Sequence, residues 1–311
     1  MNPELLVIVD LPEAHVAELR QHFTVHYVPN PQQLEHQIGK LGASVRAVLT
    51  NGITGLNASQ LEALPRVELI HALGAGFEAV DIKAARTRNV KLSYGPNTND
   101  SNVADHAFAL LFALVRGIAR CDSQIRQGEW PRFDFPSIAG KRLGILGLGN
   151  IGLQLAQRGS RGFDMPVSYH TRSPREDSPY TYAASVLELA EWSDYLVVAC
   201  PGGPSTFHIV DARVLEALGP KGYLVNIARG TVVDTPALID ALRDKRIAGA
   251  ALDVVEGQPH PPQALLELPN TVFTPHIAGR SPEARDAMLK KALANLCGHF
   301  RDESLLTPVP A

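Results

Sequence analysis

Leu143-Gly-Ile-Leu-Gly147-Leu-Gly149-Asn150-Ile151-Gly152 joins an apolar run to the pattern G-x-G-x-x-G, and a helix-like stretch at 153–158 follows it. This order predicts a strand, a tight turn and a helix. Gly147 permits the turn, Gly149 lets the backbone approach a pyrophosphate, and Gly152 lets the helix pack against the strand. The N–H groups and positive dipole end of that helix would face the phosphates. We therefore expect a dinucleotide here, with a plain strand-to-helix connection as the alternative.

Composition sets limits on the class of protein. The chain has 311 residues, of which 45% are hydrophobic and 20% charged, so two domains with cores can form. The net charge of −3 and the scattered arginines provide no basic surface for nucleic acid. No stretch approaches the roughly 18 apolar residues of a membrane span, and no secretory signal is visible, so we expect a cytoplasmic protein. The three cysteines lack metal-ligand spacing, so no metal site is expected.

Apolar runs alternate with helical patterns along the chain, which predicts parallel sheets. The last helical pattern, 282–300, is expected to return to the first domain. We expect an α/β protein with two doubly wound parallel sheets, in which a Rossmann dinucleotide-binding domain (99–282) is inserted into a flavodoxin-like substrate domain (1–98 and 283–311). One long helix is expected over 101–128. The predicted strands are 5–9, 25–28, 47–49, 67–72 and 90–93, then the run from 143, 166–169, 194–199, 223–227, 248–253 and 271–274.

The segment after the second predicted strand of the dinucleotide domain reads His170-Thr171-Arg172-Ser173-Pro-Arg175. NAD sites usually carry an acidic residue here, which binds the ribose hydroxyls. A carboxylate would repel a 2′-phosphate, whereas a guanidinium offers paired donors that match one. The sequence therefore favours NADP over NAD, with solvated loop charges as the alternative for Arg172 and Arg175.

Three later segments place polar residues at predicted strand ends, where open α/β sheets bind their ligands. They contain Arg229, the run from Asp253 to Gln258, and His276. An arginine can hold the carboxylate and carbonyl of a 2-keto acid, and a histidine can transfer the hydroxyl proton while hydride moves to or from a nicotinamide. Arg229 and His276 are therefore the candidate catalytic pair.

With these residues the chain resembles the D-isomer-specific 2-hydroxyacid dehydrogenase family over nearly its whole length. The matching motifs are Gly74-Ala75-Gly76-Phe-Glu-Ala-Val-Asp81, Asn102-Val103-Ala-Asp105-His106, Gly147 to Gly152, Asn226 to Thr231, Asp253 and Pro275-His276. The resemblance implies that the backbone of Leu73, Gly74, Ala75 and Gly76 receives the substrate carboxylate, that Arg229 clamps the keto acid, and that His276 is the acid/base. Asn51 begins a possible specificity loop. The resemblance implies cofactor contacts from Val103, Gly147, Gly149, Asn150, Ile151, Gly152, His170, Thr171, Arg172, Ser173, Cys200, Pro201, Thr206, Ile227, Ala228, Arg229, Asp253, His276, Ala278 and Gly279.

One position departs from the family pattern. The family usually has an acid before the proline of its Asp-Val-Phe-x-x-Glu-Pro segment, and here Gln258 occupies that place. A carboxylate beside His276 would favour the imidazolium, whereas an amide orients the ring without adding charge. We therefore expect a lower pKa for the histidine than a carboxylate partner would produce. The alternative is that Glu256 replaces the missing acid through a shift of the loop.

The resemblance is strongest to the NADPH-using glyoxylate and hydroxypyruvate reductases of the family. It implies reduction of small 2-keto acids to D-2-hydroxy acids, with NADPH preferred to NADH. Two alternatives remain open, a reductase of bulkier acids such as phenylpyruvate or 2-ketogluconate, and a dinucleotide-sensing regulatory protein of the corepressor type. By resemblance, we also expect a homodimer.

Overall fold

The computed structural model describes residues 2–310. The chain divides into two compact units, one formed by the residues up to Asn99 and from Arg280 onward, the other by Asp100–Gly279. The units change at 99/100 and 279/280, one and three residues from the positions expected above. The assignment of substrate to the first unit and dinucleotide to the second stays a prediction.

The first unit contains a five-stranded parallel sheet of order β2-β1-β3-β4-β5, which is the flavodoxin-like order. Adjacent residues of β1 point to opposite faces: Leu5 and Val7 join one core cluster, and Leu6 joins the other. Leu289, Ala292 and Leu296 of α12 belong to the first cluster. The elements are β1 (Glu4–Val7), α1 (Glu13–Arg20), β2 (Thr24–Tyr27), α2 (Pro31–Leu41), β3 (Ala47–Asn51), α3 (Ala58–Glu62), β4 (Leu69–Leu73), α4 (Ile82–Thr87), β5 (Lys91–Tyr94) and α12 (Pro282–Asp302).

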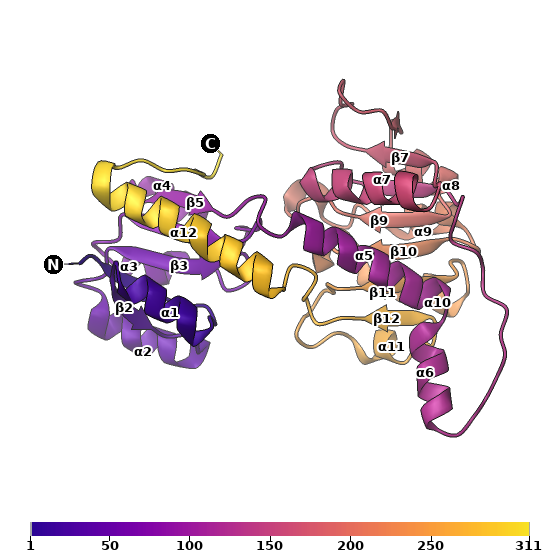
Figure 1. The fold of residues 1–311 in the computed structure, drawn as a ribbon, viewed down its shortest axis with the longest axis horizontal. Coiled ribbons are helices and arrows are strands. Elements are labelled where there is room, and N and C mark those ends of the chain that lie inside the picture. Colours follow the sequence, from indigo (N-terminus) through magenta and orange to yellow (C-terminus); the bar gives the residue numbers. More distant parts are fainter. Residues whose placement is uncertain (1, 311) are drawn as a thin grey trace. The chain divides into compact units, whose positions relative to one another are not determined.

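The second unit contains a seven-stranded parallel sheet of order β12-β11-β10-β9-β6-β7-β8. Counted from β6, this is the Rossmann order 3-2-1-4-5-6 with one more strand at the β12 edge. Helix α5 packs against β10, β11, β12 and α7 (Figure 1). The elements are α5 (Asp100–Val115), α6 (Ile118–Arg126), β6 (Leu143–Leu146), α7 (Asn150–Gly162), β7 (Val167–His170), β8 (Thr181–Tyr182), α8 (Val186–Trp192), β9 (Tyr195–Val198), η1 (Pro204–Thr206), α9 (Ala212–Leu218), β10 (Tyr223–Asn226), η2 (Gly230–Val232), α10 (Thr235–Arg243), β11 (Gly249–Leu252), α11 (Gln263–Leu266) and β12 (Thr271–Phe273).

The single helix expected over 101–128 is wrong, because it is two helices. Helix α5 ends at Val115, and α6 follows at an angle of 60°. Gly117 lies between them with φ +59°, a conformation that glycine adopts without steric cost. A Cβ there would come 2.5 Å from the ring of Phe135, so a later segment of the chain packs onto the break. Figure 1 shows α6 and the segment after it extending from the body of this unit.

The predicted fold class is confirmed, with two parallel sheets that each have apolar clusters on both faces. Parallel sheets need such cover because their crossover helices lie on both sides. The two-residue strand β8 was not predicted, since Thr181–Tyr182 is too short for a periodic pattern.

Candidate active site

The predicted dinucleotide turn lies between the end of β6 and the start of α7. Gly147 has φ +102°, and a Cβ there would come 2.7 Å from the backbone of Cys200. A Cβ at Gly152 would overlap the carbonyl oxygen of Gly147. By contrast, a Cβ at Gly149 would meet no heavy atom within 4 Å, and no side chain caps α7. The turn therefore fits a pyrophosphate, because its backbone is closely packed at Gly147 and Gly152 and has open space at Gly149.

The two arginines after β7 have different surroundings. Arg172 is exposed and makes no hydrogen bond or ion pair with any residue of the described part of the chain. Arg175 donates to both carboxylate oxygens of Asp177, at 3.1 and 3.0 Å, and to the carbonyl oxygen of Leu148 at 2.9 Å. Arg175 is therefore not a freely solvated loop charge, and its contact with a phosphate stays a prediction.

The other side chains after β7 partly bond to the protein itself. His170 Nδ1 lies 2.9 Å from the carbonyl oxygen of Ala183, and the Thr171 hydroxyl donates to the carbonyl oxygen of Ser173 at 2.7 Å. These bonds shape the loop that carries Arg172. Of the four residues predicted there, Arg172 and Ser173 keep side chains exposed to an incoming ligand.

The loop after β9 carries Cys200, Pro201 and Thr206. Burial raises the pKa of the Cys200 thiol to about 11, so the thiol stays neutral. The Thr206 hydroxyl donates to the carbonyl oxygen of Pro201 at 2.7 Å, which closes the loop on itself. Thr206 therefore acts on the shape of the loop in this structure.

Arg229 follows β10 and is held by its neighbours. The Asn226 carboxamide accepts from Ala228 N at 3.0 Å and donates to the carbonyl oxygen of Arg229 at 3.1 Å. Arg229 Nη1 donates to the carbonyl oxygen of Ala228 at 2.7 Å. A Cβ at Gly202 would come 2.6 Å from Arg229 Cγ, so the arginine stem lies directly over that glycine. The half-buried guanidinium is thereby positioned at the carboxyl edge of the sheet.

The Arg229 loop packs directly on the next loop of the sheet. A Cβ at Gly230 would overlap the backbone of Val255 and Glu256. Strands β10, β11 and β12 are adjacent in the sheet, and Arg229, Gln258 and His276 follow them in that order. The topology therefore brings the three predicted catalytic residues to one edge of one sheet.

Asp253, at the end of β11, organises the turn that carries His276. It is 2% exposed. Its Oδ1 accepts from the Thr274 hydroxyl at 2.6 Å and from Ile277 N at 2.9 Å, and its Oδ2 accepts from Ala278 N at 3.0 Å. Its carbonyl oxygen accepts from His276 N at 2.9 Å. Both carboxylate oxygens thus bind the histidine turn, a positioning function that the sequence did not indicate.

His276 has an unusual backbone conformation and a defined partner. Its φ is +55°, in the left-handed region that residues other than glycine seldom adopt, and such conformations gather at functional sites. Gln258 Nε2 lies 2.9 Å from His276 Nδ1. Gln258 is therefore in contact with the imidazole, at the nitrogen that a carboxylate partner would bind.

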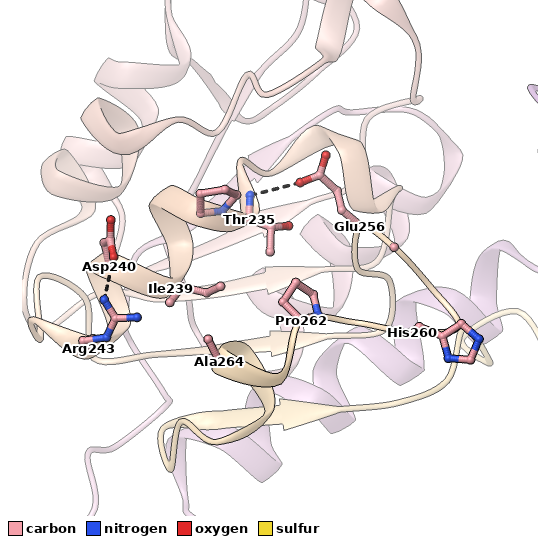
Figure 2. A pocket seen from close by; sticks show the side chains of 10 residues that line it. Thr235, Ile239, Asp240, Arg243, Glu256, His260, Pro262 and Ala264 are labelled. Atoms are coloured by element: carbon pink, nitrogen blue, oxygen red, sulfur yellow. Dashed lines mark hydrogen bonds and ion pairs between the residues drawn. The ribbon is translucent and has the colours of Figure 1, made fainter.

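Glu256 does not take the place of the missing acid. Its carboxylate binds His208 Nε2 at 2.8 Å and accepts from Thr235 N at 3.2 Å. Figure 2 shows this carboxylate directed at the start of α10, on a pocket of about 540 Å³. Although burial opposes ionisation, the hydrogen bonds from His208 and Thr235 lower the pKa of Glu256. The loop-shift alternative is therefore wrong, because this charge is bound elsewhere.

The backbone predicted to receive the substrate carboxylate, Leu73 to Gly76, begins at the last residue of β4, and we call it the carboxylate cradle. Gly74 has φ +79°, and its carbonyl oxygen accepts from Gly95 N at 2.8 Å. The N–H groups of Ala75 and Gly76 donate to no acceptor in the part of the chain that the structure describes. Two unused backbone donors after a sharp turn match the needs of a carboxylate.

The Asn51 side chain bonds to the loop that it begins, and its contact with a substrate stays a prediction. Its side-chain oxygen accepts from Ile53 N at 2.9 Å and Thr54 N at 2.7 Å. A Cβ at Gly52 would come 2.6 Å from the backbone of Gly76. Asn51 thus folds the loop that packs on the cradle, and only its amide nitrogen remains for a ligand.

One residue near the candidate site, His106, was not predicted as a site residue from the sequence. His106 Nε2 lies 2.9 Å from the Thr274 hydroxyl and 3.5 Å from Asp253 Oδ1. His106 is three positions after Val103 on α5, so the two share a helix face. That spacing was the available signal.

The remaining predicted cofactor residues lie at the same edge of the second unit. Val103, Ile227, Ala228 and Ala278 are buried, and Asn150 and Ile151 start α7.

Across residues 2–310 no group of three or more His, Cys, Asp or Glu side chains could hold a metal ion. In the same range, no single helix has both the length and the apolar character to span a bilayer; the bent pair α5 and α6 passes that test jointly.

Comparisons with known proteins bear on this site. The family model "D-isomer specific 2-hydroxyacid dehydrogenase, NAD binding domain" matches residues 108–278. A hydroxyphenylpyruvate reductase of Plectranthus scutellarioides is 43% identical over 269 residues, 86% of each chain. A 2-ketogluconate reductase of Gluconobacter oxydans is 38% identical over 99% of each chain. The crystal structure of an NADPH-dependent glyoxylate/hydroxypyruvate reductase of Sinorhizobium meliloti with NADP and malonate has a TM-score of 0.92 and 34% identity, covering 99% of this chain and 97% of that one.

The chain belongs to the D-isomer specific 2-hydroxyacid dehydrogenase family, as its motifs predicted. It is therefore an oxidoreductase that interconverts 2-keto and 2-hydroxy acids with a nicotinamide dinucleotide.

Proposed function

We propose that this protein is an NADPH-dependent reductase of small 2-keto acids, glyoxylate and hydroxypyruvate among them, and that it forms D-2-hydroxy acids. The observation that carries the proposal is the succession of Arg229, Gln258 and His276 after three adjacent strands, with Gln258 bonded to His276. The Sinorhizobium meliloti enzyme, named for these two keto acids, supports the choice of substrate.

When bound, NADPH would supply the hydride, and this chain would supply the binding and the proton. Arg229 presents a planar, always charged guanidinium that can bind carboxylate and carbonyl oxygens together. In the first unit, the unused N–H groups of Ala75 and Gly76 can donate to a carboxylate. His276 donates the proton to the carbonyl oxygen as it becomes a hydroxyl. Asp253 keeps the turn that carries His276 in place.

Gln258 affects the protonation of His276. Its Nε2 donates to Nδ1, which leaves the ring proton of a neutral imidazole on the other nitrogen. Its Oε1 faces Val255 N at 3.5 Å, which favours this orientation of the amide. Protonation of Nδ1 would require the amide to turn its oxygen toward the ring, so the amide supports the imidazolium less than a carboxylate does.

Replacement of Gln258 by glutamate should therefore extend activity to higher pH. A carboxylate beside the ring favours its charged form, and reduction needs that form as proton donor. We expect the upper apparent pKa of kcat/KM to rise by about one unit or more. The matched control is Gln263→Glu, which adds the same charge on α11. Equal pH–rate profiles for Gln258→Glu and the unsubstituted protein would contradict the prediction.

Preference for NADPH is assigned to Arg172, the exposed arginine after β7. Loss of a charge-assisted, paired hydrogen bond to a 2′-phosphate should weaken NADPH binding about 10- to 100-fold. NADH lacks that phosphate, so its affinity should change little. Fluorescence titration of Arg172→Met with both cofactors measures this, with Arg213→Met, an exposed arginine of α9, as the control. A preference for NADPH that survives in Arg172→Met would refute the assignment.

The test of the proposed function is kcat/KM for glyoxylate, hydroxypyruvate, phenylpyruvate and 2-ketogluconate with both cofactors. The proposal expects the highest values for glyoxylate or hydroxypyruvate with NADPH. A protein that binds NADPH but turns over none of these acids would instead favour a sensing function.

A reductase of a bulkier acid is the second candidate, and two observations favour it. Gly203, next to the glycine on which the Arg229 stem packs, has open space, since a Cβ there would meet no atom within 4 Å. The relatives named for hydroxyphenylpyruvate and 2-ketogluconate are 43% and 38% identical to this chain. The same panel of acids separates the two candidates.

We further propose that the protein acts as a homodimer in the cytoplasm. Helix α6 buries none of its residues, and Ile118, Ile125 and Trp130 are 53, 49 and 77% exposed. Where exposed apolar side chains gather on one surface, they often mark an interface. The three cysteines are free thiols, which suits a reducing compartment. Light scattering in solution measures the mass directly.

A further inference from the structure

Arg175 connects the loop after β7 to the glycine turn after β6. Its Nη1 donates to the carbonyl oxygen of Leu148 at 2.9 Å. Its Nε and Nη2 donate to the carboxylate of Asp177 at 3.1 and 3.0 Å. Its backbone N–H donates to the hydroxyl of Tyr169, a residue of β7 that is 1% exposed, at 2.8 Å. The side chain is 34% exposed, so about two thirds of it lies against the protein.

The bond to Leu148 acts on the part of the turn that has the greatest conformational freedom. Leu148 lies between Gly147 and Gly149, and a peptide unit is planar and trans. By holding the carbonyl oxygen of Leu148, the guanidinium fixes the plane that this residue shares with Gly149, and with it the direction of Gly149 N–H. Gly149 is the N-cap residue of α7 and has open space where a side chain would be. A glycine turn without such a restraint samples more conformations.

The bond to Asp177 sets the charge of the loop. The Arg175 guanidinium hydrogen-bonds this exposed carboxyl and lowers its pKa, so Asp177 is charged at neutral pH and its charge is offset by Arg175. Two of the guanidinium's three nitrogens are bound to Asp177 and the third to Leu148. Arg172, three residues earlier, is exposed and has no such partner among the described residues.

We propose that Arg175 is a positioning residue for the pyrophosphate-binding turn and so supports NADPH and NADH alike, whereas Arg172 alone distinguishes them. The proposal rests on the dinucleotide site and cofactor preference proposed above. The two arginines look equivalent in the sequence but have different proposed functions. Arg172 recognises the 2′-phosphate, and Arg175 holds the glycine turn in its binding conformation.

The experiment compares Arg175→Met/Asp177→Asn with Asp177→Asn alone. Asp177→Asn is present in both variants because, once Arg175 is removed, the Asp177 carboxylate would be unpaired and would repel the cofactor. The dissociation constants of NADPH and NADH are measured by fluorescence titration, and thermal unfolding shows that each variant is folded. We expect the added loss of Arg175 to raise the dissociation constants of NADPH and NADH by about tenfold each, so that the ratio of the two constants stays unchanged. Arg172→Met should weaken NADPH alone.

Three results would overturn the inference. A loss confined to NADPH on removing Arg175 would make Arg175 a ligand of the 2′-phosphate. Unchanged affinity for both cofactors would show that the bond to Leu148 does not support binding. If the unsubstituted protein binds neither cofactor, the proposed function fails together with the inference. Arg175→Lys, which offers one nitrogen in place of the three that make these bonds, should fall between the unsubstituted protein and Arg175→Met in cofactor affinity.

Discussion

Replacement of His276 by asparagine lowers kcat for keto-acid reduction by about 10²- to 10⁴-fold, the usual contribution of a positioned general acid. Asparagine is the informative choice because it tolerates the left-handed conformation, φ +55°, that this position adopts. The turn held by Asp253 is thus kept while the imidazole is lost. In energy the loss corresponds to about 2.7–5.4 kcal/mol of transition-state stabilisation.

The controls for His276→Asn separate chemistry from binding. NADPH affinity, measured by fluorescence titration, should remain within a few-fold, because the proposed function of the imidazole is proton transfer to the substrate. His260→Gln changes an exposed histidine of the segment between β11 and α11 and should keep activity near that of the unsubstituted protein. Full activity of His276→Asn would remove this histidine from the mechanism.

Replacement of Arg229 by methionine lowers kcat/KM for keto acids by about 10²- to 10⁴-fold. The expected cause is loss of the paired, charge-assisted hydrogen bonds to the carboxylate and carbonyl oxygens. Methionine retains an apolar stem over Gly202, so the change removes the guanidinium with little effect on packing. Arg229→Lys keeps the charge but not the planar fork, and should recover only part of the loss.

Steady-state kinetics with NADPH saturating measures the Arg229 effect. Arg243→Met is the matched control, since Arg243 is an exposed arginine of the same unit, paired with Asp240. NADPH affinity of Arg229→Met should stay nearly unchanged. If kcat/KM fell only as far in Arg229→Met as in Arg243→Met, the guanidinium would not be the keto-acid clamp.

Some parts of the fold could be predicted because their causes are local. The apolar run before Gly147 and the glycine spacing are encoded in consecutive residues, so the strand, turn and helix were predictable. The break between α5 and α6 was not predictable, because a single glycine such as Gly117 can lie inside a helix. It becomes a break only where another segment of the chain favours the bend. Phe135, eighteen positions later, packs on that glycine.

The candidate site shows the same division. The sequence alone determined which residue types were available at the strand ends: Arg229, Gln258 and His276 follow three apolar runs, and the order of those runs predicts one sheet edge. Only the tertiary structure decided what each polar group binds. Glu256 and Gln258 are two positions apart, yet one binds His208 and the other His276. Arg172 and Arg175 look equivalent in sequence, yet Arg175 alone is bonded to Asp177 and Leu148. The physical reason is that periodicity and spacing reflect the local backbone, whereas a hydrogen-bond partner depends on which distant loop the packed sheet brings within about 3 Å.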